Sequence, residues 1–185
     1  MRGVQGIGGH TKPNKGQDVI WLTPPSILQA LGTFDLDPCA APSPRPWPTA
    51  ARHIELPTDG LTENWGTGRV WLNPPYDESL GGWMERMALH GRGIALVFAR
   101  TEIDVWQKWI WPYADSVLFI AGRLYFRYPD GSSATGNAGG PSALIAYSTA
   151  DSQILDRSGI RGALVEVKKP RATRKELSCP PTHNS

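Results

Sequence analysis

The sequence predicts an α/β fold in which a mostly parallel sheet has helices on both faces. Short, continuously apolar runs recur along the chain, as expected for strands buried on both sides. Segments with helical spacing separate several of these runs. The 185 residues suffice for one compact domain, but not for a catalytic domain joined to an independently folded recognition domain.

We expect this domain to occupy residues 18–167. Residues 1–17 are rich in Gly, Lys and Asn, and residues 168–185 are rich in Lys, Arg, Pro and Ser. Neither end has hydrophobic periodicity, so both are expected to be flexible. No apolar stretch approaches the roughly 20 residues that span a bilayer, so we expect a soluble protein without a membrane partner.

Composition excludes some classes of protein. The net charge of +2 permits a nucleic-acid partner without requiring one. Cys39 and Cys179 are far apart and the histidines show no ligand spacing, so neither a disulfide framework nor a metal site is expected. This cysteine usage fits a reducing cytosol.

The first half of the domain is expected to contain short elements. Apolar residues 18–22 lead into Thr23-Pro24-Pro25, whose prolines can start a helix over residues 26–31. A short strand over residues 34–37 follows. The proline-rich run 41–48 excludes a helix or a central strand, so a loop is expected there.

The second half contains a strand–helix–strand pattern. Residues 69–72 are expected to form a buried strand, 79–90 a helix and 93–99 a second buried strand. A further helix and three further strands are predicted over residues 102–113, 116–120, 142–147 and 163–167. The Gly- and Ser-rich run 127–141 is expected to be a loop that orders on a ligand.

Two loops follow predicted strands and are expected to form two halves of one site. They are Asp37-Pro38-Cys39-Ala40 and Asn73-Pro74-Pro75-Tyr76, and ligands of α/β sheets bind beyond the carboxyl ends of strands. In the second loop, two prolines fix the backbone and leave carbonyl groups without competing amide donors. The result is a rigid set of acceptors.

These acceptors suit methylation of the exocyclic amine of adenine. The lone pair of that nitrogen is delocalised into the ring and must be drawn out of conjugation. The Asn73 side-chain oxygen and the Pro74 carbonyl can each accept one N–H, while the Tyr76 ring stacks on the base. No strong general base is needed, because a sulfonium methyl donor is already activated and the proton can leave after transfer.

The chain resembles the phage-type DNA N-6-adenine methyltransferases, a family of S-adenosylmethionine-dependent enzymes. The similarity runs from about residue 21 to about residue 147 and consists of several motifs in one order. The motifs are Trp21-Leu22-Thr23-Pro24-Pro25, Phe34-Asp35-Leu36-Asp37-Pro38-Cys39-Ala40, Asp59-Gly60-Leu61 with Trp65, Asn73-Pro74-Pro75-Tyr76, Arg100-Thr101 with Trp106, and Gly122-Arg123-Leu124-Tyr125-Phe126.

The resemblance implies a Rossmann-like fold that transfers a methyl group from S-adenosylmethionine to N6 of adenine in DNA. It identifies Asn73, Pro74, Pro75 and Tyr76 as the catalytic motif. It also implies a phage or restriction–modification setting, in the cytoplasm of a bacterial host cell.

The resemblance further implies a cofactor site. Thr23 and Pro24 would lie near the methionine part of the cofactor, and Asp59 near its adenine. Between them, the loop Asp37, Pro38, Cys39 and Ala40 would follow the cofactor-binding strand. The chain departs from many methyltransferases because this loop is not glycine-rich. Glu55, after a possible strand at residues 53–56, is an alternative carboxylate for the ribose hydroxyls, ranked below Asp59.

A target adenine must leave the duplex to reach such a site, at a cost of a few kcal/mol. Stacking on a ring contributes about 1 to 3 kcal/mol per base, so Tyr76 and one further ring would offset most of this cost. Phe126 and Trp106 are the candidates, although both also fit a core role. Arg100, Arg123 and Arg127 are candidate phosphate contacts, and no basic run is dense enough to mark a DNA groove.

Other functions stay open. The same loop would polarise adenine in RNA or a protein glutamine side chain, and the missing glycines allow a catalytically silent DNA-binding module. Loops 41–50 and 127–141, where DNA would be read, hold few informative residues, so we expect low sequence specificity. The sequence does not determine the oligomeric state.

Overall fold

The computed structural model describes residues 20–136 and 138–168. The predicted flexible ends, residues 1–17 and 168–185, lie outside these ranges except for Lys168. Within them, the order of elements is α1 (Pro25–Leu31), β1 (Leu36–Asp37), β2 (Arg52–His53), β3 (Val70–Leu72), α2 (Leu80–His90), β4 (Gly93–Phe98), the π-helix η1 (Trp106–Ile110), β5 (Ser116–Ile120), β6 (Ser142–Ala146), α3 (Thr149–Arg157) and β7 (Gly162–Glu166).

The seven strands form one mixed sheet in the order β2-β1-β3-β4-β6-β5-β7. The pairings β2–β1, β1–β3 and β3–β4 are parallel, whereas β4–β6, β6–β5 and β5–β7 are antiparallel and longer. The α/β class is confirmed, but the expected mostly parallel sheet is not. Apolar runs reveal that a strand is buried, and they carry no signal for its direction.

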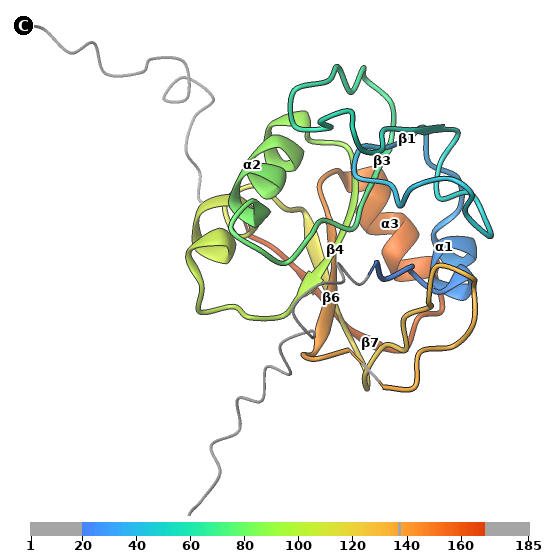
Figure 1. Ribbon diagram of the computed structural model, residues 1–185. Helices are drawn as coiled ribbons and strands as arrows, with labels where there is room; N and C mark the ends of the chain where they lie inside the picture. The colour runs from blue at the N-terminus through green and yellow to red at the C-terminus, as the bar shows by residue number, and fades with distance from the viewer. Residues whose placement is uncertain (1–19, 137, 169–185) are drawn as a thin grey trace, which may run out of the picture.

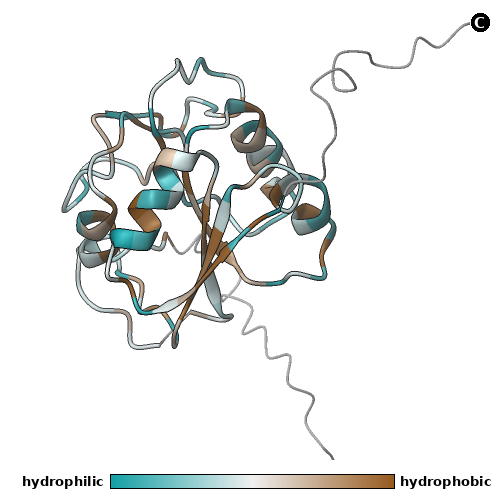
Figure 2. Cartoon of the chain, turned by 180° about the vertical axis from the view of Figure 1, so that it is seen from behind, coloured by the Kyte–Doolittle hydropathy of each residue, from teal (hydrophilic) through white to brown (hydrophobic). Residues whose placement is uncertain are grey.

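Helices cover both faces of the sheet (Figure 1). One face packs against α2 and η1 through Leu72, Ala95, Val97, Val117 and Ile145. The other packs against α1 and α3 through Trp71, Ile94, Leu96, Leu118 and Leu144. The residues alternate between the two faces because a strand has a two-residue period. Since both faces are covered, the central strands are apolar along their whole length, as the hydrophobic colour in Figure 2 shows.

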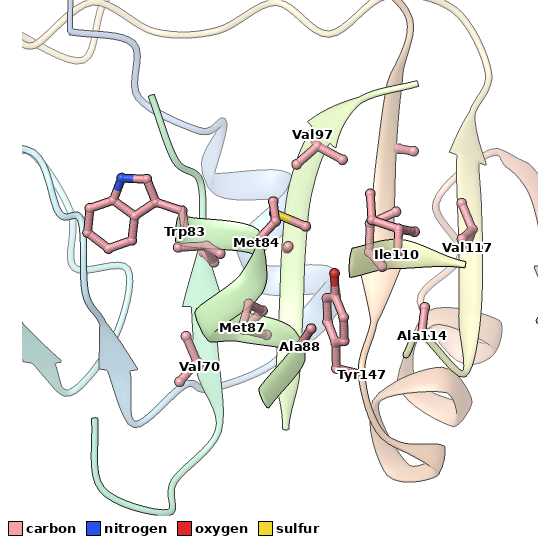
Figure 3. Close-up of a cluster of buried hydrophobic side chains, with 14 of the residues drawn as sticks. Val70, Trp83, Met84, Met87, Ala88, Val97, Ile110, Ala114, Val117 and Tyr147 are labelled. Carbon is pink, nitrogen blue, oxygen red and sulfur yellow. The ribbon is translucent and has the colours of Figure 1, made fainter. Parts of the chain in front are cut away.

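Helix α2 is amphipathic, with most of its apolar residues on the side that is buried. Trp83, Met84, Met87 and Ala88 recur at helical spacing and are all buried. The Trp83 ring extends to the side of the helix (Figure 3), where it stacks on Trp65. The helix ends at Gly91, which adopts a left-handed conformation with φ of 70° that glycine tolerates without strain. The predicted helix over residues 79–90 is therefore confirmed, together with the flanking strands β3 and β4.

Other elements differ from the sequence-based expectation. The helix predicted over residues 102–113 is regular only as the five-residue η1, and the strands expected over residues 34–37 and 53–56 shorten to β1 and to β2 at residues 52–53. Helix α3 was not predicted. Its apolar residues are few: Leu155 packs into the core, and an acidic side chain attaches the first turn of the helix to the sheet.

That side chain is Asp151, which is 1% exposed. One carboxylate oxygen accepts from Arg69 Nε at 2.6 Å, and the other accepts from the Gly93 N–H at 2.7 Å. The hydroxyl of Ser148, which caps α3, also donates to Asp151. This network ties α3 to the amino-terminal ends of β3 and β4.

Over the described part of the chain, no helix is long and apolar enough to cross a membrane.

Candidate active site

The two predicted loops meet at the carboxyl edge of the parallel strands. Strand β1 ends at Asp37 and β3 ends just before Asn73. The chain goes from β1 outward to β2 on one side, and from β3 to β4 on the other, so the order of strands reverses between β1 and β3. Such a switch point opens a crevice for ligands. The Cys39 thiol, which donates to the Asn73 carbonyl at 3.3 Å, joins the two loops directly.

Asn73 presents a free acceptor at this point. Its Nδ2 donates to the hydroxyl of Thr23 at 3.3 Å, and Thr23 is only 3% exposed. Its Oδ1 is buried and has no hydrogen-bond partner. A buried polar oxygen left without a donor is costly in a folded protein, so the atom is poised to accept from a ligand.

The Tyr76 ring is held with its surface partly open. The ring is 39% exposed, while its hydroxyl donates to the Leu96 carbonyl at 3.2 Å. Burial of this hydroxyl raises the pKa of Tyr76, so it stays a neutral donor. One face stacks on Phe98, with the centroids 4.2 Å apart and the planes 21° from parallel. The ring is therefore available for stacking and fixed at its far end.

Asp37 is buried and serves its own loop. It is 4% exposed, and it accepts hydrogen bonds from the Thr49 hydroxyl and, at 3.1 Å, from the Cys39 N–H. Burial raises the pKa of Asp37 to about 6, although these hydrogen bonds oppose the shift. Burial and the nearby Asp37 charge also raise the pKa of the Cys39 thiol, which therefore acts as a neutral donor.

Asp59 lies beside the Asp37 loop because of the glycine that follows it. A Cβ on Gly60 would lie 1.8 Å from the carbonyl oxygen of Pro38, so only glycine allows this approach. Asp59 itself is exposed and accepts from the Leu61 N–H at 2.9 Å. The competing carboxylate, Glu55, is paired with Arg45.

The remaining predicted cofactor residues line the same region. Pro24, Pro38 and Ala40 are buried next to Thr23 and Asp37 in the sequence, and the Ala40 N–H donates to the Ile54 carbonyl at 3.0 Å. In the other loop, Pro74 is buried and Pro75 is exposed. The structure thus brings most of the predicted cofactor and catalytic residues to one edge of the sheet.

The rings predicted to stack on a base are placed differently. Trp106 is 1% exposed and Phe126 is 7% exposed, and both belong to the hydrophobic cores. The prediction that Trp106 stacks on a base is corrected, because its ring packs on Phe119 and its Nε1 donates to the Phe98 carbonyl at 3.1 Å. The ring beside Tyr76 is Phe98, which sequence reasoning missed.

A signal for Phe98 existed in the sequence. It ends β4, the parallel neighbour of β3, so both strands deliver their last residues to the same edge. Of the three predicted phosphate contacts, Arg100 lies over the Phe98 ring at 5.7 Å, Arg123 is exposed, and Arg127 is partly buried and donates to the Ser133 hydroxyl. No group of His, Cys, Asp and Glu among the described residues could hold a metal ion.

The sequence model of the DNA N-6-adenine-methyltransferase (Dam) family matches residues 9–172. The chain belongs to this family. For a DNA adenine methyltransferase, the substrate is a planar base with an exocyclic amine, and the site offers an open ring at Tyr76 and a free acceptor at Asn73. No characterised protein and no solved structure matched the chain in the corresponding searches.

Proposed function

We propose that this DNA adenine methyltransferase transfers a methyl group from S-adenosylmethionine to N6 of an adenine flipped out of the duplex. The observation that carries the proposal is the buried Asn73 Oδ1, which has no partner within the protein. An N–H of the adenine amine would satisfy it, and the Pro74 carbonyl would accept the second N–H. Tyr76 would stack on the base.

The cofactor supplies a methyl group already activated by sulfonium. With both amine hydrogens held by Asn73 and Pro74, the nitrogen lone pair turns out of the ring plane toward the methyl carbon. As the bond from nitrogen to the methyl carbon forms, the bond from that carbon to the cofactor sulfur would break, and the sulfur would leave as a neutral thioether. The methylated nitrogen would then carry the positive charge and lose a proton to water without a strong base. No carboxylate is needed at the reacting nitrogen.

The residues present fit the cofactor. Gly60 leaves the Asp37 loop in contact with the Asp59 segment, where a side chain would clash, and the exposed Asp59 carboxylate is free to bind an adenine or ribose group. We therefore propose Thr23, Pro24, Asp37, Pro38, Cys39, Ala40 and Asp59 as the cofactor site. Because Glu55 already pairs with Arg45, Asp59 is preferred to it.

The proposal includes a Rossmann-like arrangement. Strand β5 is antiparallel to β6, which is antiparallel to β4, so strands β1 to β5 all run in one direction and only β6 and β7 are reversed. The switch point between β1 and β3 is where such folds bind nucleotides. A phage or restriction–modification setting in a bacterial cytoplasm, and low sequence specificity, complete the proposal.

Mass spectrometry of nucleosides tests the function. Unmethylated DNA is incubated with S-adenosylmethionine and the wild type, Asn73→Ala or Gln153→Ala, which removes an exposed amide on α3. We expect N6-methyladenine from the wild type and from Gln153→Ala, but not from Asn73→Ala. Cofactor binding without a methylated DNA base would point to adenine in RNA or a protein glutamine side chain as the substrate, and failure to bind S-adenosylmethionine would favour a catalytically silent module.

A further inference from the structure

A pair of aromatic rings, one exposed and one half-buried, lies two residues from Thr23 and outside the proposed machinery. Trp21 is 45% exposed, although large apolar side chains are usually buried. Its ring contacts that of Tyr128, with centroids 5.5 Å apart and planes tilted by 31°. The pair joins two segments that are more than a hundred residues apart in the sequence.

The backbone shows which way this pair faces. Leu22 and Arg127 form an antiparallel bridge and exchange both N–H···O bonds, each at 2.9 Å. This register sets Trp21 opposite Tyr128, and it sets Thr23 two residues further along the same face. The Thr23 hydroxyl accepts a hydrogen bond from Asn73 Nδ2. Trp21 and Thr23 therefore lie on the same face of this segment, with Thr23 at the catalytic loop and Trp21 further from it.

We propose that Trp21, backed by Tyr128, stacks on the base of a nucleotide next to the target adenine in DNA. This inference rests on the proposed function and names a contact on its substrate. The two rings are too close for a base to enter between them, which would need roughly 7 Å from two van der Waals gaps. The base therefore lies on the outer face of the indole.

Charge and rigidity favour a nucleic-acid partner over an apolar peptide. Arg127 lies on the bridge itself, but strand alternation turns its side chain to the face opposite to Trp21, where it donates to the Ser133 hydroxyl. Arg123, four residues earlier, is exposed, and such a cation suits a phosphate of the strand that carries the stacked base. The nearby Asp130 carboxylate is turned into its own hairpin, where it accepts from the Ser132 N–H at 2.8 Å.

The hairpin that carries Tyr128 is braced from behind. A Cβ on Gly131 would lie 3.2 Å from both Pro46 and Trp47, so the hairpin tip packs closely on the proline-rich loop. Gly131 has φ of 85°, a conformation that suits glycine in the turn. The platform is therefore built before DNA arrives, which lowers the entropy lost on binding.

Fluorescence anisotropy with a labelled oligonucleotide containing one adenine tests the inference at fixed salt. We expect Trp21→Ala to bind roughly 5- to 100-fold more weakly, as for the loss of one base–aromatic stack, and Trp21→Phe to bind within a few-fold of wild type. The matched control is Leu89→Ala, which removes a 67% exposed side chain from α2. Wild-type affinity in Trp21→Ala would overturn the inference.

An abasic site identifies the stacked base. Removing the base on either side of the adenine in turn should weaken the wild type on one side only, and Trp21→Ala should be insensitive to that change. If the variant loses as much affinity as the wild type on each abasic strand, Trp21 does not touch that base. If the wild type binds DNA with this pattern but forms no N6-methyladenine, the platform stands and the proposed function fails.

Discussion

The hydroxyl of Thr23 is expected to set the orientation of the catalytic amide. It accepts from Asn73 Nδ2 at 3.3 Å and is almost fully buried, so water cannot take its place. In Thr23→Val, which preserves the shape of the side chain, Nδ2 becomes a buried donor without an acceptor, at a cost of about 1 to 3 kcal/mol. The amide can then rotate and turn its nitrogen toward the adenine amine.

A misdirected amide removes one of the two acceptors that activate the adenine nitrogen. Single preorganised hydrogen bonds of this kind contribute about 10²- to 10³-fold to kcat, and we expect part of this loss, about 10- to 100-fold. Thr23→Ser, which keeps the hydroxyl, should recover to within a few-fold. Single-turnover transfer of a tritiated methyl group measures the chemical step directly.

Cofactor affinity separates this role from a direct cofactor contact. Because Thr23 also belongs to the proposed cofactor site, we expect titration calorimetry to show a Kd for S-adenosylmethionine in Thr23→Val that is weaker by a few-fold at most, a smaller change than the loss in the single-turnover rate, and a Kd close to wild type in Thr23→Ser. A weaker Kd with an unchanged single-turnover rate would make Thr23 a cofactor ligand alone. An unchanged rate and an unchanged Kd would refute the reasoning that the amide needs this hydroxyl.

Three further predictions concern stability and positioning. Arg69→Met leaves the buried Asp151 carboxylate without its ion-pair partner, so urea unfolding should show a loss of about 3 to 5 kcal/mol; a loss below 1 kcal/mol would contradict this. Because the folded pKa of Asp37 is raised from 3.8 to about 6, its contribution to stability is present below pH 3.8 and lost as the pH rises through 6. Asp37→Asn should therefore gain about 2 kcal/mol relative to wild type between pH 4 and pH 7, and a constant difference across this range would disprove the shift. Phe98→Ala removes the ring that backs Tyr76 and should lower kcat more than it raises KM, whereas Phe98→Leu should lie between; equal rates in all three proteins would remove Phe98 from the site.

The sequence predicted the buried strands and α2 well, because their apolar residues recur at the period of each element. It did not predict α3, whose attachment depends on Asp151 and on Arg69, 82 residues away. A buried ion pair between distant segments leaves no local pattern. The antiparallel entry of β6 between β4 and β5 was missed for a similar reason, since burial does not encode direction.

At the candidate site, the sequence indicated which loops to examine, but not how their atoms pair. The free Oδ1 of Asn73 and the bond from Cys39 to the Asn73 carbonyl depend on the meeting of two loops in space. The aromatic assignments show the same limit. Trp106 and Phe98 are both large aromatic residues, and only the packing decides that the first is buried in the core and the second lies against Tyr76.

The close packing of Gly131 on Pro46 and Trp47 has a consequence for the evolution of DNA specificity. The loops 41–50 and 127–141 are the expected reading surfaces, and this contact makes them one mechanical unit. An insertion in either loop, or a larger residue at position 131, would shift the other loop and with it the Trp21 platform. A change of recognition sequence would therefore require the two loops to be exchanged together, and grafting one alone should yield a protein that folds but binds DNA poorly.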